Sequence, residues 1–203
     1  MSRDRLIAGG IFALGLAALG GYGLSQSAAV AQDATDGPGP NLTVEVAGST
    51  TGTVTIDLAS DVAPNHVAQI VALAKEGAYD GVVFHRVING FMAQTGDVEF
   101  GKHGGDTSMA GTGGSQLPDL KAEFSSMPFD RGVVGMARSM DPDSANSQFF
   151  IMFAPAPHLD GQYTIVGHVI SGMEVVDAIK KGDDAANGAV IDPDYMAKVT
   201  VAE

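Results

Sequence analysis

The chain has 203 residues, of which 45% are hydrophobic and 17% charged, and its formal net charge is −13. This composition is sufficient for one domain with a hydrophobic core. The negative charge argues against nucleic acid as a partner, because an acidic domain repels phosphate. The chain contains no cysteine, which excludes disulfides, thiol catalysis, thiolate metal sites and a lipid anchor attached to cysteine.

Residues 1–31 are expected to be an export signal. Arg3 and Arg5 give a short basic start, an uncharged and mainly apolar run covers 6–19, and a small-x-small site lies at 29–31. Cleavage at this site would make Gln32 the first residue of the mature protein. The predicted location is therefore the periplasm or the outside of the cell.

An uncleaved membrane anchor is the alternative for this segment. Residues 6–24 carry no charge and are just long enough to span a bilayer. Several glycines in this run weaken a spanning helix, so cleavage is favoured, and the membrane is a partner only if the segment stays uncleaved. Residues 32–40 are expected to be a polar, disordered linker, and 41–203 the folded domain.

The domain is expected to open with a β-hairpin. Apolar and polar residues alternate in 42–46 and again in 53–58, which is typical of two strands that each bury one face. Residues 64–77 then begin with proline, continue with apolar residues at helical spacing and end with glycine, which predicts a helix. His66 lies in its first turn and is expected to be solvated.

Strands are next expected at 82–87 and 92–96, followed by the glycine-rich stretch 97–128. Such a long stretch inside a compact domain is often functional. It lacks the GK[ST] of a P-loop and has no GxGxxG that opens a helix, so a phosphate-binding loop is disfavoured.

The remainder of the chain adds more strands and a second helix. Many short strands with two helices indicate an antiparallel barrel capped at its ends. The expected strands are 133–138, 148–152, 164–170 and 195–201, and the expected helix is 173–180.

Patterns typical of other chemistries fail in this sequence. Residues 113–117 depart from the GxSxG motif of hydrolases at the last position. The five histidines show no HExxH spacing, and the acidic turn at 141–146 lacks the glycine and glutamate of an EF-hand. No metal and no cofactor is therefore expected.

Six strings carry a resemblance to a known family. They are FHRVINGFMAQTGD at 84–97, GTGG at 111–114, AEF at 122–124, GVVGMAR at 132–138, NSQFFI at 146–151 and LDGQYTIVGHV at 159–169. In this order they resemble the cyclophilins, the cyclosporin-binding class of peptidyl-prolyl cis/trans isomerases. The resemblance implies a mainly β fold, a closed eight-stranded antiparallel β-barrel capped by two α-helices.

The resemblance also implies the activity and the site. The reaction would be rotation about X–Pro peptide bonds, without covalent intermediate, in proline-containing unfolded or partly folded polypeptides of the cell envelope. Arg86 would be catalytic, through a hydrogen bond to the proline nitrogen of the twisted amide. A monomer is expected. The substrate-binding residues would be Phe91, Met92, Gln94, Ala137, Arg138, Gln148, Phe150, His158, Leu159 and Tyr163.

Three positions depart from the better-known eukaryotic pattern. Arg138 replaces Asn, His158 replaces Trp and Tyr163 replaces His, so weak binding of cyclosporin A is expected. His85, beside Arg86, is interpreted as a buried structural histidine, because the reaction transfers no proton. The alternative function is a noncatalytic proline-peptide binding module or chaperone on the same fold, and retention of Arg86 favours the enzyme.

Overall fold

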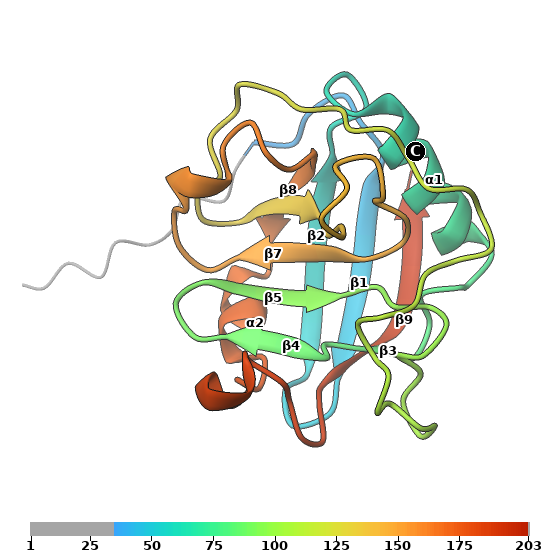
Figure 1. The fold of residues 1–203 in the computed structure, drawn as a ribbon, viewed down its shortest axis with the longest axis vertical. Coiled ribbons are helices and arrows are strands. Elements are labelled where there is room, and N and C mark those ends of the chain that lie inside the picture. Colours follow the sequence, from blue (N-terminus) through green and yellow to red (C-terminus); the bar gives the residue numbers. More distant parts are fainter. Residues whose placement is uncertain (1–34, 203) are drawn as a thin grey trace, which may run out of the picture. The chain divides into compact units, whose positions relative to one another are not determined.

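Nine strands form one antiparallel sheet in the computed structural model, which describes residues 35–202 (Figure 1). Their order across the sheet is β3-β9-β1-β2-β8-β6-β7-β5-β4. The mainly β architecture with two helices is thus confirmed. The strands are β1 (Asn41–Ala47), β2 (Gly52–Leu58), β3 (Val82–Val83), β4 (Arg86–Ile88), β5 (Met92–Thr95), β6 (Val133–Met136), β7 (Phe149–Met152), β8 (Ile165–Ser171) and β9 (Tyr195–Ala202).

The first hairpin, β1 and β2, illustrates how the sequence builds the sheet. Leu42 lies opposite Ile56 and Val44 opposite Val54 in the β1–β2 ladder. All four side chains are buried, whereas the residues between them point to the other face of the sheet. A shift of one residue would bring the polar residues inside, so the alternation determines the register.

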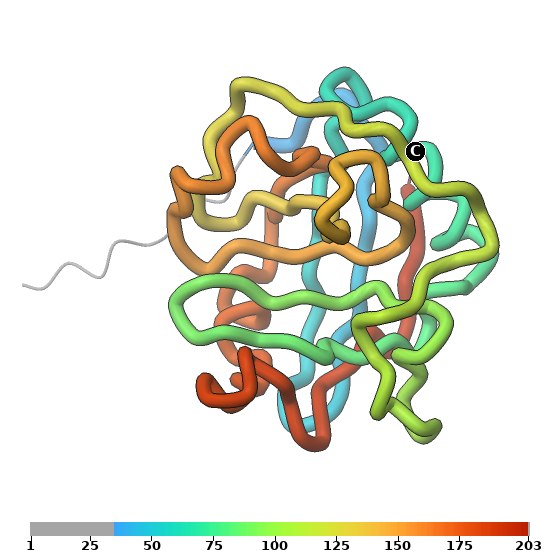
Figure 2. The backbone as a smooth tube through the Cα atoms, viewed as in Figure 1, coloured from blue at the N-terminus to red at the C-terminus, as the bar shows by residue number. Residues whose placement is uncertain are grey.

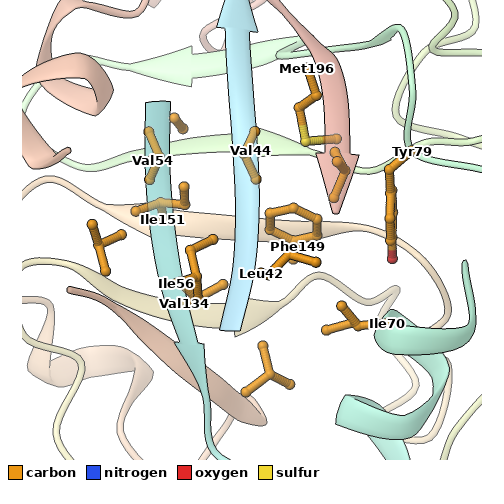
Figure 3. Packing of buried hydrophobic residues seen from close by; sticks show 14 of the residues in the cluster. Leu42, Val44, Val54, Ile56, Ile70, Tyr79, Val134, Phe149, Ile151 and Met196 are labelled. Carbon is orange, nitrogen blue, oxygen red and sulfur yellow. The ribbon is translucent and has the colours of Figure 1, made fainter. Parts of the chain in front are cut away.

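The main core lies where the sheet curls over itself. Phe149 and Ile151 of β7 belong to the same buried cluster as Val44 and Ile56, although β7 pairs with neither β1 nor β2 (Figure 3). In Figure 1, β7, β5 and β4 accordingly cross in front of β1 and β2. Tyr79 packs edge-on against Phe149, with ring centroids 5.7 Å apart. The core therefore occupies the inside of a barrel-like sheet.

Helix α1 (Pro64–Lys75) is capped by a residue distant in the sequence. The backbone N–H groups of Asn65 and His66 donate to the carboxylate of Glu123 at 3.2 and 3.1 Å, and His66 Nδ1 lies 2.6 Å from Glu123 Oε2. A negative charge at this position stabilises the helix N-terminus. The prediction that His66 is solvated was wrong, because its side chain is fully buried.

The second helix, α2 (Met173–Ala178), is shorter than predicted. Ile179 leaves the helix with φ −49° and ψ 132°, and the backbone N–H of Lys180 donates to Asp194 Oδ2 at 2.8 Å. This bond to a distant carboxylate replaces the helical bond that a further turn would have supplied.

The expected single strand at 82–87 is divided into β3 and β4, which form the two edges of the sheet. Among the described residues these edges do not pair with each other, so the sheet has nine strands and an open ladder rather than the closed eight-stranded ladder expected. The reason is that residues 182–190 occupy the outer edge of β4. Val87 N–H donates to Gly188 O at 2.8 Å, and Val190 N–H to His85 O at 3.1 Å.

The long segment before β6 and the residues before β1 both lie against the rest of the domain. Residues 96–132 pass α1 and round one end of the sheet before β6 (Figure 2). The described part of the expected linker lies against the sheet, since Gly37 N–H donates to Asp57 Oδ2 at 3.0 Å and Leu58 N–H to Pro40 O at 3.0 Å. The expected signal at 1–31 lies outside the described residues. None of the helices between residues 35 and 202 has the length and apolar character that a membrane crossing requires.

Candidate functional site

A row of paired residues crosses four neighbouring strands on the face opposite the main core. Arg86 of β4 lies opposite Gln94 of β5, Gln94 lies opposite Phe150 of β7, and Phe150 lies opposite Gly135 of β6. Directly opposite residues of antiparallel strands project from the same face. The register of the sheet therefore brings a cation, an amide and an aromatic ring together.

A cavity of about 190 Å³ opens above this row. All of its lining residues belong to the set predicted from the sequence: Arg86, Phe91, Met92, Gln94, Ala137, Arg138, Phe150, Leu159 and Tyr163. The remaining two predicted residues are adjacent. Gln148 lines a neighbouring cavity of about 300 Å³, and the exposed His158 stacks on Phe91 with ring centroids 5.8 Å apart.

The floor of the 190 Å³ cavity is apolar and belongs to a second buried cluster. Met92, Phe150 and Leu159 are at most 8% exposed. Phe129, which the sequence did not single out, stacks beneath Phe150 at 5.8 Å, and Tyr163 meets Phe150 edge-on at 5.8 Å. A rigid apolar floor of this kind suits a small hydrophobic ring.

Gly135 allows the two aromatic rings to pack there. A Cβ atom at this position would lie 2.6 Å from Phe150 Cζ and 2.7 Å from Phe129 Cε1. Both distances are below van der Waals contact, so a larger residue would displace the floor of the cavity. The second glycine of the GVVGMAR string, Gly135, therefore has a packing function.

Arg86 is held at the side of the cavity by hydrogen bonds to neutral groups. Its Nη1 donates to Gln94 Oε1 at 3.1 Å and contacts Met92 Sδ at 3.9 Å. Its Nε donates to Asn187 O at 3.1 Å, and its Nη2 to Asn187 Oδ1 at 3.0 Å. Partial burial lowers the pKa of Arg86 from its ordinary value, yet an arginine remains charged at neutral pH.

The hydrogen bonds continue from Arg86 into the glycine-rich stretch. Gln94 Nε2 donates to Gln148 Oε1 at 3.0 Å, and Gln148 Nε2 donates to Gly113 O at 2.8 Å. This sequence of bonds fixes the orientation of both amides, because each amide oxygen accepts and each amide nitrogen donates.

The buried carboxylate of Asp97 holds the glycine-rich stretch in place. Its Oδ2 accepts from the backbone N–H groups of Gly111 and Gly113 at 2.7 and 2.9 Å, and its Oδ1 from Phe100 N–H at 2.9 Å. A Cβ atom on Gly113 would lie 2.7 Å from Asp97 Oδ1, so this position requires glycine. The stretch is thus a fixed wall of the 300 Å³ cavity, which residues 111–113 line.

A second arginine, Arg138, lines both cavities. Its guanidinium carbon lies 4.4 Å from the centre of the Tyr163 ring, and its Nη2 donates to Gln162 O at 2.9 Å. These contacts hold a planar cation against an aromatic face. The site therefore presents positive charge at the cavity of an otherwise acidic chain.

His85 lies behind this site, and both of its ring nitrogens are buried. Burial, reinforced by the charge of Arg86, lowers the pKa of His85 to about 4, while Asp97 acts in the opposite direction. His85 is therefore neutral at physiological pH, in agreement with its interpretation as a structural residue.

Sequence reasoning missed Asn187, which contacts Arg86 across 101 positions of the chain. The local signal was an Asn-Gly pair, which is typical of a turn with positive φ, and Asn187 has φ 54°. That signal identifies the turn without indicating what the turn contacts.

The chain is similar to known proteins in sequence and in fold. The sequence model of a family described as cyclophilin type peptidyl-prolyl cis-trans isomerase/CLD matches residues 42–201. A protein named probable peptidyl-prolyl cis-trans isomerase from Brucella suis is 63% identical over 152 residues, which cover 74% of this chain and 78% of that protein. A peptidyl-prolyl cis-trans isomerase from Helicobacter pylori strain J99 is 41% identical over 136 residues, which cover 65% of this chain and 77% of that protein.

Solved structures show the same fold. The cyclophilin AquaCyp293 from Hirschia baltica matches with a TM-score of 0.61 and 28% identity, over 79% of this chain and 76% of that one. A cyclophilin-type peptidyl-prolyl cis-trans isomerase from Cryptosporidium parvum, solved in the presence of the dipeptide Ala-Pro, matches with a TM-score of 0.67 and 24% identity, over 80% of this chain and 99% of that one. At this identity the second likeness concerns the fold alone.

Proposed function

This chain belongs to the cyclophilin-type peptidyl-prolyl cis-trans isomerases, and from that premise we propose that its 190 Å³ cavity receives the proline ring while Arg86 stabilises the twisted amide. The apolar floor formed by Met92, Phe150 and Leu159 supports the first half of this proposal, because a proline ring is small and hydrophobic. The position of Arg86 at the side of the same cavity supports the second.

The chemistry follows from the resistance of the peptide bond to rotation. Resonance between the nitrogen lone pair and the carbonyl gives a barrier of roughly 18–20 kcal/mol. At the top of the barrier the amide is twisted, and the lone pair returns to the proline nitrogen, which becomes a hydrogen-bond acceptor. A donor that meets the nitrogen only in this state binds the transition state more strongly than either planar isomer, and so accelerates the reaction. No bond breaks and no proton moves.

One observation carries the proposal: a charged planar donor without a carboxylate partner lines a cavity whose floor is apolar. Each hydrogen bond of Arg86 within residues 35–202 goes to an amide, a carbonyl or a thioether. A carboxylate would offset the charge of the guanidinium. Neutral acceptors hold the group in place and leave its field available to the substrate.

The test is a protease-coupled or NMR exchange assay on a short Ala-Pro peptide with the purified protein. We expect the chain to accelerate the exchange and Arg86→Ala to lose most of that acceleration while still binding the peptide. Peptide binding without acceleration by the unmodified chain would instead support the noncatalytic binding module. The clients in the cell would be unfolded or partly folded chains that contain proline.

We infer that the protein acts outside the cytoplasm, on polypeptides of the cell envelope. Support comes from the sequence of residues 1–31, with its basic start, apolar run and small-x-small site at 29–31. Mass spectrometry of the protein from an envelope fraction should find Gln32 at the N-terminus. Recovery of intact residues 6–24 in the membrane pellet would contradict cleavage and support an anchor.

A further inference from the structure

Asn187 follows the 3₁₀ turn η2 (Asp184–Ala186) and accepts two hydrogen bonds from Arg86. Its backbone carbonyl accepts from Arg86 Nε at 3.1 Å, and its side-chain Oδ1 accepts from Arg86 Nη2 at 3.0 Å. The two acceptors meet one edge of the guanidinium, while Gln94 meets Nη1. The side chain of Asn187 is otherwise exposed, and its described hydrogen bond is the one to Arg86.

The backbone of Asn187 is fixed to the strand that carries Arg86. Val87 N–H donates to Gly188 O, and Gly182 N–H donates to Val87 O, both at 2.8 Å. A Cβ atom on Gly188 would lie 2.5 Å from Ile88 Cγ1, so the turn lies directly on β4. Because the turn is hydrogen-bonded to β4, which also carries Arg86, that strand fixes the distance between Asn187 and Arg86.

The hydrogen bonds of Arg86 leave one donor for a substrate. A guanidinium has five N–H groups in one plane. Nε and one Nη2 N–H bond Asn187, and the Nη1 group meets Gln94 and Met92. Among residues 35–202, no acceptor remains for the second N–H of Nη2. Because the two hydrogens of Nη2 are related by the fixed geometry of the group, the bond to Asn187 Oδ1 determines where the second one points.

We propose that Asn187 is a positioning residue for the isomerisation: its side-chain oxygen orients the guanidinium of Arg86 so that the free Nη2 N–H faces the proline nitrogen in the twisted state. This inference rests on the proposed function of Arg86. The amide of Asn187 is suited to the task because it accepts a hydrogen bond without carrying a negative charge. The nearby carboxylates of Asp183 and Asp184 would carry one.

The variant that isolates this contact is Asn187→Gly in the full chain. Asn187 has φ 54° and ψ 36°, a left-handed conformation that glycine adopts without strain. The backbone carbonyl that accepts from Nε stays, so the variant removes Oδ1 alone. Ala186→Gly is the matched control, because it adds the same backbone freedom to the neighbouring residue, whose backbone bonds Asp183 and Ala189 rather than Arg86.

We expect Asn187→Gly to lower kcat about three- to tenfold, the loss typical of one hydrogen bond, with the Kd for an Ala-Pro peptide unchanged. Ala186→Gly should keep both values. In the Arg86→Ala background, Asn187→Gly should cost nothing further, because the group that it orients is gone.

The outcomes separate this inference from the proposed function. If the unmodified chain fails to catalyse exchange, the proposed function fails. If it catalyses and Asn187→Gly matches it in kcat, the inference alone is overturned. An equal loss in Ala186→Gly, a loss expressed in Kd rather than kcat, or an additive loss with Arg86→Ala would overturn it as well, because each shows that the turn acts on something other than the guanidinium.

Discussion

Arg86 Nη1 donates to Gln94 Oε1 at 3.1 Å, and these two residues lie directly opposite each other in the β4–β5 ladder. The position of the cation therefore depends on strand register as well as on the turn that carries Asn187. Gln94 is held in turn by Gln148, which bonds the carbonyl of Gly113. A site built on paired strands and supported by satisfied amides is preorganised, so little reorganisation is required when a peptide binds.

The first prediction concerns the identity of this cation. Arg86→Ala and Arg86→Lys should both fold and both lose about 10²–10³-fold in kcat/KM, the range found when a donor to a transition-state charge is removed. Lysine keeps the charge but lacks the planar guanidinium that donates to Gln94 and to Asn187 at the same time. Isomerase kinetics and far-UV circular dichroism provide the two measurements.

Arg131→Lys is the matched control for that substitution. Arg131 lies outside the cavity and forms a two-bond ion pair with Asp177 at 2.8 and 2.6 Å. The control loses a planar fork of the same kind, and we expect its kcat/KM to equal that of the unmodified chain. Near-full efficiency in Arg86→Lys would contradict the proposed role of the Arg86 donors.

The second prediction is a flat pH profile of catalysis. Arg86 stays protonated, no proton is transferred, and the pKa of His85 is lowered to about 4, so none of these groups titrates near neutrality. We expect kcat/KM to vary less than about twofold between roughly pH 6 and pH 9. NMR exchange measurements avoid the pH dependence of a coupling protease. A bell-shaped profile centred near neutral pH would show that a titrating group takes part.

The third prediction follows from the same histidine but concerns stability. His85 has an ordinary pKa of 6.5 and a folded-state pKa of about 4. As the pH falls below 6.5, the unfolded chain takes up the proton first, so the free energy of unfolding decreases until the folded state is protonated near pH 4. The stability that neutral His85 contributes is fully present above pH 6.5 and is lost progressively between pH 6.5 and about pH 4.

His85→Gln removes this titration and leaves the others. Between pH 7 and pH 5, we expect the free energy of unfolding of the unmodified chain to fall by about 2 kcal/mol more than that of the variant. Burial acts to raise the pKa of Glu123, but its hydrogen bonds to His66 and Asn65 outweigh this and lower it; the carboxyl is the same in both proteins and cancels from the comparison. Denaturant unfolding at the two pH values measures the difference, and equal losses would mean that His85 is not shielded from water.

Much of the cavity could be predicted because the family resemblance indicated its residues, of which Arg86, Met92, Gln94 and Phe150 lie on strands. Phe149 and Ile151 face the core, which places Phe150 and Met152 on the opposite face, where the cavity lies. The spacing of Arg86 and Gln94 within one string is short enough for a hairpin to pair them. Alternation thus explains why these positions share a face, whereas their assignment to the site came from the family resemblance.

The features that sequence reasoning missed depend on contacts between distant residues. Glu123 caps α1 across 57 positions, which converts an apparently solvated His66 into a buried partner. The pairing of residues 182–190 with β4 keeps the sheet from closing and delivers Asn187 to Arg86. A loop that adds its backbone to a strand edge leaves no periodic pattern, so neither the strand count nor this contact followed from the residues.

The fourth prediction concerns cyclosporin A, which binds drug-sensitive cyclophilins with the help of a tryptophan where this chain has His158. The structure places His158 on the 3₁₀ turn η1 (Pro157–Leu159), exposed and stacked on Phe91 at 5.8 Å with 28° between the rings. Phe91 and Leu159 line the 190 Å³ cavity, so His158 stands at its rim. An imidazole offers a smaller apolar face than an indole, and its N–H reaches less far.

We therefore expect weak inhibition of the unmodified chain and a gain of about ten- to a hundredfold in cyclosporin affinity for His158→Trp, which corresponds to roughly 1–3 kcal/mol from added apolar area and one hydrogen bond. Peptide turnover should change little, because the floor of the cavity is untouched. Ile191→Trp serves as the control, since Ile191 is 80% exposed and lies outside that cavity, and it should gain nothing. Inhibition titrations of the three proteins decide the matter: tight inhibition before substitution, or an equal gain in both variants, would show that the ring at position 158 does not govern access of the drug to the rim.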